Sequence, residues 1–241
     1  MCTVTLIPKG KNDFVLTSNR DEAPNRTSLA PKMYSIENTK LLFPKDVLSG
    51  GTWVGLSEKN RLICVLNGAN EKHIRKPKYR LSRGVVAKDF LVCDTIEIKV
   101  ESYNLIDIEP FTMVIVDWNI TLKFYELVWN GTKKHFNELP LEPKIWSSST
   151  LYNETMKQER LQWFETYKIE HVLNAESLLN FHKTAGQKND DYGVVMNRGF
   201  VKTTSITQVE KVDEVLEMRY ENLQNKSNSI STFNMPQTVN E

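Results

Sequence analysis

The sequence has few of the residues that build disulfide frameworks or metal sites. Its 241 residues include three cysteines, Cys2, Cys64 and Cys93, an odd number that lie far apart. This spacing predicts a reducing compartment such as the cytoplasm, with no disulfide framework and no zinc site. The four histidines form no paired ligand pattern, so we expect neither a metal nor another cofactor.

Long apolar runs and glycine-rich phosphate loops are also missing. No run approaches the roughly 20 apolar residues of a transmembrane helix. Polar residues at positions 9 and 11–13 interrupt the N-terminal apolar stretch, so we expect no secretory signal. Neither the P-loop nor the dinucleotide-binding pattern occurs. A formal net charge of +1 does not indicate a nucleic-acid partner, which leaves a small-molecule substrate or an apolar ligand as the expected partner.

What the sequence does contain is a strong hairpin signal in its first 22 residues. Two β-branched, apolar runs, Cys2 to Ile7 and Phe14 to Ser18, flank a turn rich in Gly, Asn and Asp. The second run ends in four polar residues, Asn19, Arg20, Asp21 and Glu22. Because a hairpin returns to its starting point, we expect this quartet to lie close to Cys2.

Cys2 has the chemistry of an N-terminal nucleophile. Removal of Met1 would leave its α-amine, with a pKa of about 7.7–8.0, on the same residue as a thiol with a pKa of about 8.5. Nucleophile and base would then occupy one residue, an arrangement found in enzymes that use an N-terminal amine as the base. The alternative is that Cys2 is only an apolar strand residue near a terminus.

The rest of the chain predicts an α+β fold. Further hairpins are expected around positions 50–66 and 111–128, and helices over 83–92, 153–167 and 174–182. Residues 23–40 are expected to form a loop, and three late strands are expected at 192–196, 200–204 and 215–220. There is no alternation of strands and helices of the kind that builds parallel sheets, so helices covering antiparallel sheets are the simplest arrangement. We expect one domain over residues 1–221 and a polar, disordered tail over 222–241.

A basic stretch from Glu71 to Arg83 carries six Lys or Arg side chains. The simplest interpretation is a solvated loop. The alternative is a basic lip over the site that attracts an anionic group of a substrate.

Four motifs give a resemblance to a known family. They occur in the order found in the NRDE family, also called the transport and Golgi organization family. The four motifs are Met1-Cys2-Thr3, residues 18–22, residues 49–55 and Ser82-Arg83-Gly84. Residues 146–151 resemble a later family segment, with Ser148 where asparagine is usual. These motifs supply the candidate substrate-binding residues Asn19, Glu22, Trp53, Arg83 and Ser148.

The family is similar, in turn, to N-terminal-nucleophile hydrolases of the bile-salt hydrolase and penicillin acylase type. The resemblance implies a four-layer αββα fold with two antiparallel sheets. It also implies that Cys2 is the nucleophile, flanked by Arg20 and Asp21, and that Asn67 helps to form an oxyanion hole. Side chains of adjacent strand residues point to opposite faces, so we expect only one of Arg20 and Asp21 to reach Cys2 unless the strand has ended.

Two functions of different classes follow from this sequence. The first is a cysteine amidohydrolase or acyltransferase that acts on a linear amide or thioester. The second is a non-catalytic carrier or chaperone that binds haem or an acyl-type lipid on the same scaffold. Its five tryptophans could line an apolar pocket, although tryptophans are more often part of a core.

Overall fold

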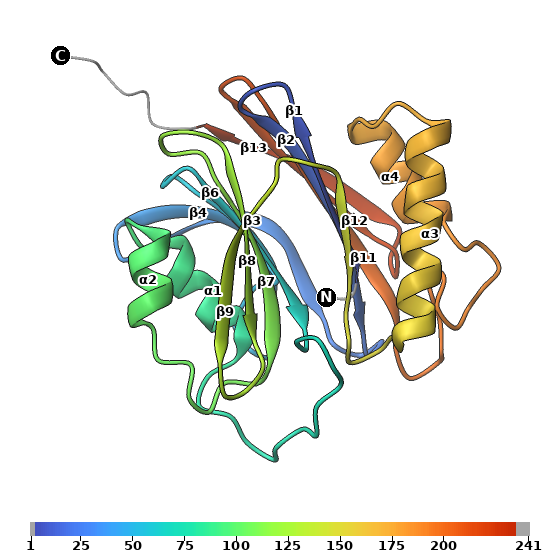
Figure 1. The fold of residues 1–241 in the computed structure, drawn as a ribbon, viewed down its shortest axis with the longest axis horizontal. Helices are drawn as coiled ribbons and strands as arrows, with labels where there is room; N and C mark the ends of the chain where they lie inside the picture. Colours follow the sequence, from blue (N-terminus) through green and yellow to red (C-terminus); the bar gives the residue numbers. More distant parts are fainter. Residues whose placement is uncertain (1–2, 235–241) are drawn as a thin grey trace.

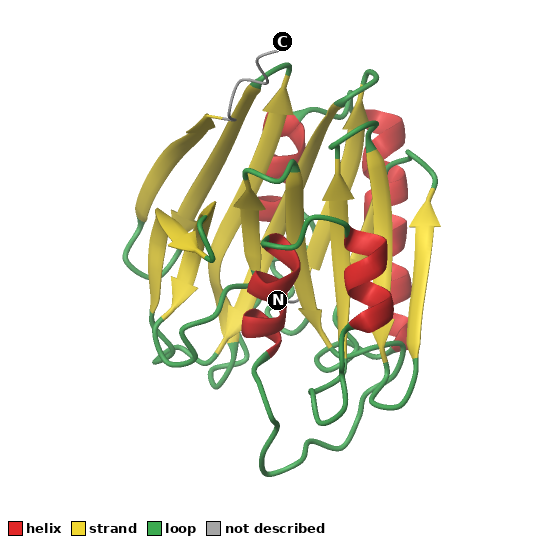
Figure 2. Ribbon diagram, turned by 90° about the vertical axis from the view of Figure 1, so that its left-hand side faces the viewer, coloured by secondary structure: helices red, strands yellow, loops and turns green. Residues whose placement is uncertain are grey.

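The computed structural model describes residues 3–234, which form two antiparallel sheets with helices on their outer faces (Figures 1 and 2). The first sheet has the strand order β10-β1-β2-β11-β12-β13 and the second has the order β3-β4-β5-β6-β7-β8-β9. The first sheet consists of β1 (Thr3–Lys9), β2 (Asp13–Glu22), β10 (Lys144–Ser147), β11 (Lys202–Val212), β12 (Val215–Asn222) and β13 (Ser227–Asn234). The second consists of β3 (Ser28–Ile36), β4 (Thr39–Asp46), β5 (Val54–Ser57), β6 (Arg61–Asn67), β7 (Phe111–Asp117), β8 (Lys123–Trp129) and β9 (Lys134–Leu139).

Four helices complete the two outer layers. They are α1 (Arg83–Leu91), α2 (Ile96–Ser102), α3 (Glu154–Glu170) and α4 (Ala175–Thr184). Apolar side chains of α1 and α2 pack with the second sheet, whereas those of α3 and α4 pack with the first. Figure 1 shows the two helix pairs on opposite sides of the molecule. The expected four-layer αββα arrangement is therefore confirmed.

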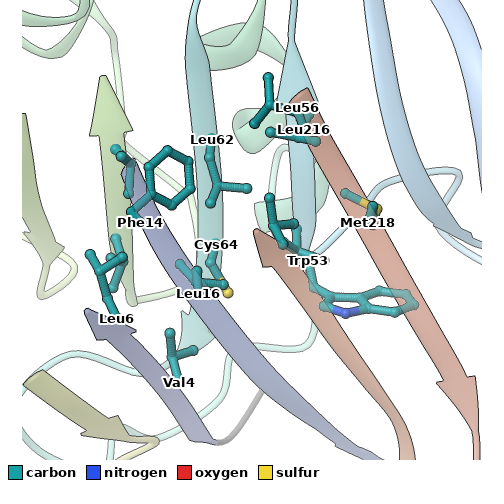
Figure 3. Close-up of a cluster of buried hydrophobic side chains, with 14 of the residues drawn as sticks. Val4, Leu6, Phe14, Leu16, Trp53, Leu56, Leu62, Cys64, Leu216 and Met218 are labelled. Atoms are coloured by element: carbon teal, nitrogen blue, oxygen red, sulfur yellow. The ribbon is translucent and has the colours of Figure 1, made fainter. Parts of the chain in front are cut away.

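The main core lies between the two sheets because the strands alternate in the direction of their side chains. In β1 and β2, Val4, Leu6, Phe14 and Leu16 all point into this core (Figure 3). The intervening residues, such as Val15, face the helix layer instead. Burying an aliphatic or aromatic side chain of this kind stabilises the fold by about 1.5–3 kcal/mol. The alternation fixes the register of the β1–β2 hairpin, in which Thr3 pairs with Asn19.

Two expectations from sequence are wrong at the sheet edges. Residues 23–40 are not one loop, because β3 lies within them and turns into β4 through Glu37 and Asn38, both of which have positive φ. Residues 227–234 are not a disordered tail, because they form β13 and pair with β12 over its full length. Both are edge strands with mostly exposed side chains, so they lack the apolar alternation by which strands are predicted. Residues 235–241 lie outside the described part of the chain.

Two smaller corrections concern the second half of the chain. Residues 192–196 do not form the expected strand. The strand expected at 200–204 is the beginning of β11, which runs from Lys202 to Val212. The apolar spacing of α3 predicts Leu161 and Phe164 on its inner face. Phe164 is buried there, but Leu161 is 39% exposed and the neighbouring Arg160 is fully buried. A charged side chain therefore occupies a place on the inner face of the helix for which an apolar residue was expected.

Candidate active site

A cavity of about 280 Å³ lies at the end of the molecule where β2, β4 and β6 terminate. Five of the residues predicted for the site line it: Arg20, Glu22, Trp53, Asn67 and Arg83. Three others, Asn19, Asp21 and Ser148, do not line it. Cys2 lies outside the described residues, which begin at Thr3, the first residue of β1.

Arg20 is the buried cation of this cavity. Its Nη2 donates to Asp46 Oδ2 at 2.7 Å, and its Nη1 donates to Thr204 Oγ1 at 3.1 Å and to the Arg26 carbonyl at 3.3 Å. The guanidinium also lies 4.7 Å from the ring centre of Trp53, a cation–π contact. Of its five N–H groups, two make no hydrogen bond to residues 3–234, and Glu22 Oε2 lies 4.0 Å from its Nη2.

Asp46, at the end of β4, was not predicted from sequence and holds two arginines in place. Besides Arg20, it accepts from Arg26 Nε at 2.8 Å and from the Ser49 backbone and hydroxyl. Burial alone would raise the pKa of Asp46, but hydrogen bonds from Ser49 and Arg26 outweigh it and hold that pKa below its usual value. The carboxylate therefore stays charged opposite Arg20. Its position three residues before Ser49 is the one sequence signal that could have indicated it, because an aspartate often caps such a turn.

Asp21 lies on the opposite face of β2 from Arg20, as the alternation of strand side chains predicts. Its carboxylate accepts from Tyr152 Oη at 2.5 Å and from Thr203 Oγ1 at 2.6 Å. The ring of Tyr152 lies under the guanidinium of Arg160, 3.6 Å from its centre. Asp21 thus belongs to a buried polar network on the helix side of the first sheet.

The same network reaches the start of β1. Arg160 donates from Nη1 to Thr3 Oγ1 at 2.6 Å, and it also donates to the carbonyls of Tyr192 and Gly193. These bonds explain why an arginine is fully buried on the inner face of α3, since a buried charge needs hydrogen-bond partners. They fix the residue that directly follows Cys2 in the sequence.

Asn19 faces the same helix layer and is a structural residue in this arrangement. Its Nδ2 donates to the carbonyls of His182 and Val194, and its Oδ1 lies 2.6 Å from Nδ1 of His182. The Nε2 of His182 lies 2.8 Å from Thr5 Oγ1. Asn19 therefore joins β2 to α4 and does not reach the cavity.

His182 gives a prediction about pH. Burial, with a smaller contribution from Arg160, lowers the pKa of His182 from 6.5 to about 3. The unfolded chain takes up this proton below about pH 6.5 while the folded chain does not, so the folded state should lose about 1.4 kcal/mol per pH unit from this group as the pH falls. In urea unfolding, we expect the stability difference between the wild type and His182→Gln to shrink by about 2 kcal/mol from pH 7 to pH 5. A difference that is the same at both pH values would mean that the folded protein also protonates this imidazole.

Asn67 ends β6 at the edge of the cavity, and its backbone is held by Ser148. The hydroxyl of Ser148 donates to the Asn67 carbonyl at 2.7 Å, and Ser147 beside it pairs with Thr3 of β1. Gly68 follows with a φ of +83°, and a Cβ there would collide with Ser149 Oγ. Ser148 therefore positions Asn67 from behind, and the tight turn after it requires glycine.

Arg83, the first residue of α1, lines the cavity together with Glu109, a residue that was not predicted from sequence. Arg83 Nη2 lies 3.3 Å from Glu109 Oε2, and Glu109 also pairs with His73 and Arg75. Ser82 caps α1 by accepting a hydrogen bond from the Val85 amide.

The segment before Ser82 forms no named helix or strand, as expected for a loop. Arg75, Lys76 and Lys78 of this segment nevertheless line the cavity, which fits the alternative of a basic lip.

The other two cysteines are poor nucleophiles. Burial raises the pKa of the Cys64 thiol to about 12, and burial also raises that of Cys93. A thiolate is the reactive form, so neither is suited to nucleophilic chemistry.

Residues 3–234 contain no group of three or more His, Cys, Asp or Glu side chains placed to hold a metal ion. Within the same residues, no helix is long and apolar enough to cross a membrane.

Solved structures with a similar arrangement of sheets and helices define the fold. An N-acylethanolamine-hydrolyzing acid amidase ortholog of Caenorhabditis elegans superposes with a TM-score of 0.60 at 11% identity, over 86% of this chain and 92% of that one. Penicillin V acylase of Agrobacterium tumefaciens gives 0.57 at 12% identity, over 97% and 86%. A variant of conjugated bile acid hydrolase from Clostridium perfringens gives 0.52 at 11% identity, over 99% and 100%. The chain therefore has the N-terminal-nucleophile hydrolase fold.

The family is established by sequence. Residues 1–237 match the family Transport and Golgi organisation 2, and the chain belongs to it. No curated protein sequence matches the chain significantly. At identities of 11–12%, the structural likeness establishes the fold alone.

Proposed function

We propose that the protein is a cysteine amidohydrolase or acyltransferase that acts on a linear amide or thioester, with Cys2 as nucleophile after removal of Met1. The observation that carries the proposal is the cavity at the end of β2 and β6, which Arg20 and Asn67 both line. It lies at the end of the molecule where β1 begins, because Thr3 pairs with Ser147 and the adjacent Ser148 bonds to Asn67. The three structural neighbours, an acylase, a hydrolase and an amidase by name, are consistent with this class of reaction.

In the proposed reaction, the thiolate of Cys2 attacks the substrate carbonyl and its own α-amine takes up the thiol proton. The amine then delivers this proton to the leaving amine or thiol, which leaves an acyl thioester on Cys2. Water, or an acceptor in acyl transfer, attacks the thioester and regenerates the thiol. The charge that develops on the carbonyl oxygen would be stabilised by the Asn67 side chain and a backbone N–H.

Arg20 and Asp21 have separate roles in this proposal. Arg20, with two N–H groups that make no hydrogen bond to the described residues, would stabilise the thiolate. The side chain of Asp21 lies on the helix side of the first sheet, as do those of Thr3 and Arg160. From there, Asp21 would orient the α-amine of Cys2. Glu22, Trp53 and Arg83 line the cavity and would contact the substrate. Asn19 and Ser148 would act by positioning β2 and Asn67.

The lining of the cavity gives no support to the alternative of a haem or lipid carrier. Six cationic side chains and three carboxylates line it, whereas an apolar ligand needs mostly apolar walls. Its volume of about 280 Å³ is also at the low end for sites that enclose a whole drug-sized molecule.

The unpaired Cys64 and Cys93 fit a reducing compartment such as the cytoplasm.

Asn67→Ala tests the proposed reaction. Loss of one oxyanion donor typically lowers kcat by about 10²–10³-fold, and we expect a loss of that size here with KM nearly unchanged. The assay is the release of a chromogenic leaving group from short N-acyl amides and acyl thioesters. Thr112→Val is a suitable control, because Thr112 bonds to the Gly68 carbonyl nearby but does not line the cavity. Equal rates for Asn67→Ala and the wild type would contradict the oxyanion role, and no turnover by the wild type on any of these amides or thioesters would favour the carrier.

A further inference from the structure

The segment between β6 and α1 extends beyond the ends of the strands. In Figure 1 it is the teal loop at the lower edge of the molecule, and Figure 2 shows it below the helix that follows it. Residues 71–80 of this loop, here called the basic loop, form no named helix or strand. The loop is thus the outermost part of the end that carries the cavity.

The charge of the basic loop is almost entirely of one sign. Its five cations are all exposed, and its single carboxylate is Glu71. The five cations are Lys72, Arg75, Lys76, Lys78 and Arg80. Two of them are compensated from outside the loop, since Arg75 pairs with Glu109 and Lys76 with Asp107. The other three have no ion pair with any described residue, so the loop presents an excess of positive charge.

Apolar side chains stand among these cations. Ile74 is 96% exposed at the centre of the basic loop. Ile106 is 67% exposed, and its carbonyl accepts a hydrogen bond from Arg80 of the loop. A basic segment that also presents bare aliphatic side chains has the two features by which proteins attach to the interface of an anionic bilayer. Nucleic acid would be attracted by the cations but offers no apolar phase for the isoleucines.

We propose that the basic loop docks the protein on the surface of an anionic lipid bilayer. Lys72, Lys78 and Arg80 bind lipid headgroups, and Ile74 enters the boundary between headgroups and acyl chains. Arg75, Lys76 and Lys78 also line the cavity, so docking turns its mouth toward the lipid. This surface goes beyond the proposed acyl transfer and does not depend on it.

Sedimentation with lipid vesicles tests the proposal on the full-length protein. We expect binding to vesicles of phosphatidylcholine mixed with phosphatidylserine, weakening steeply as salt is raised, and little binding to phosphatidylcholine alone. Lys72→Glu/Lys78→Glu should weaken binding by about thirtyfold or more, because each removed cation contributes about fivefold. Ile74→Asp should weaken vesicle binding by several-fold. This loss should depend less on salt than the loss caused by Lys72→Glu/Lys78→Glu.

Matched control variants come from the opposite end of the molecule. Lys11 and Lys40 lie in the turn before β2 and at the start of β4, and Ile120, which is 93% exposed, lies between β7 and β8. Lys11→Glu/Lys40→Glu and Ile120→Asp make the same chemical changes there and should bind vesicles like the wild type. The proposal is overturned if the wild type does not sediment with anionic vesicles, if it binds neutral vesicles equally well, or if the control variants weaken binding as much as the loop variants.

Discussion

Cys2→Ala is expected to abolish acyl transfer altogether, and Cys2→Ser to slow it strongly. Alanine removes the atom that would form the acyl intermediate. Serine keeps a nucleophile, but its hydroxyl is a much weaker one than a thiolate at neutral pH. The loss in kcat/KM should reach the limit of detection for alanine, measured on whichever acyl amide or thioester the wild type turns over.

Two controls separate this loss from damage to the fold. The thermal midpoint of both variants should stay near that of the wild type. Cys93→Ala, which removes a half-buried thiol on the far side of the second sheet, should leave kcat/KM unchanged. Full activity of Cys2→Ala would remove Cys2 from the mechanism.

Asp46→Ala is expected to cost about 3–5 kcal/mol of folding free energy, the largest effect on stability that we predict for a single polar side chain here. Its removal leaves the buried guanidinium of Arg20 with Glu22 as its nearest carboxylate, 4.0 Å away. Breaking a buried ion pair from one side is costly because a buried charge stays uncompensated. Urea unfolding at pH 7 measures the effect.

The matched control is Asp94→Ala, which breaks an exposed pair with Lys59 whose N–O distance is 2.6 Å. Water and salt screen exposed pairs, so this variant should change stability little. The effect of Asp46→Ala should also depend on pH. Since the pKa of Asp46 is lowered in the folded state, its stabilisation is complete above about pH 4 and is lost as the pH falls through the folded-state pKa. A loss below about 1 kcal/mol at pH 7 would show that Arg20 does not need Asp46.

The strands predictable from sequence were those with a buried, alternating face. In the runs from Thr3 to Ile7 and from Phe14 to Ser18, alternate residues turn an apolar side chain toward the core between the sheets. The two runs pair with each other as expected. The edge strands β3 and β13 bury little and carry polar residues, so the same alternation is absent from them.

Within the candidate site, strand geometry alone predicted only how residues adjacent in the chain are directed. The opposite directions of Arg20 and Asp21 follow from strand geometry alone. By contrast, Asn19 was expected near the substrate, but it bonds to His182, a residue 163 positions away that no local pattern connects to it. Asp46 was missed for a similar reason, because its partner Arg20 lies on the other sheet.

The measurement that tests the central claim most directly is the intact mass of the protein purified from cells, before and after incubation with an activated acyl thioester. The account predicts a mass without Met1, and a single added acyl group that hydroxylamine removes and that Cys2→Ala does not acquire. A functional protein that retains Met1, and that gains no acyl group at Cys2, would contradict the account.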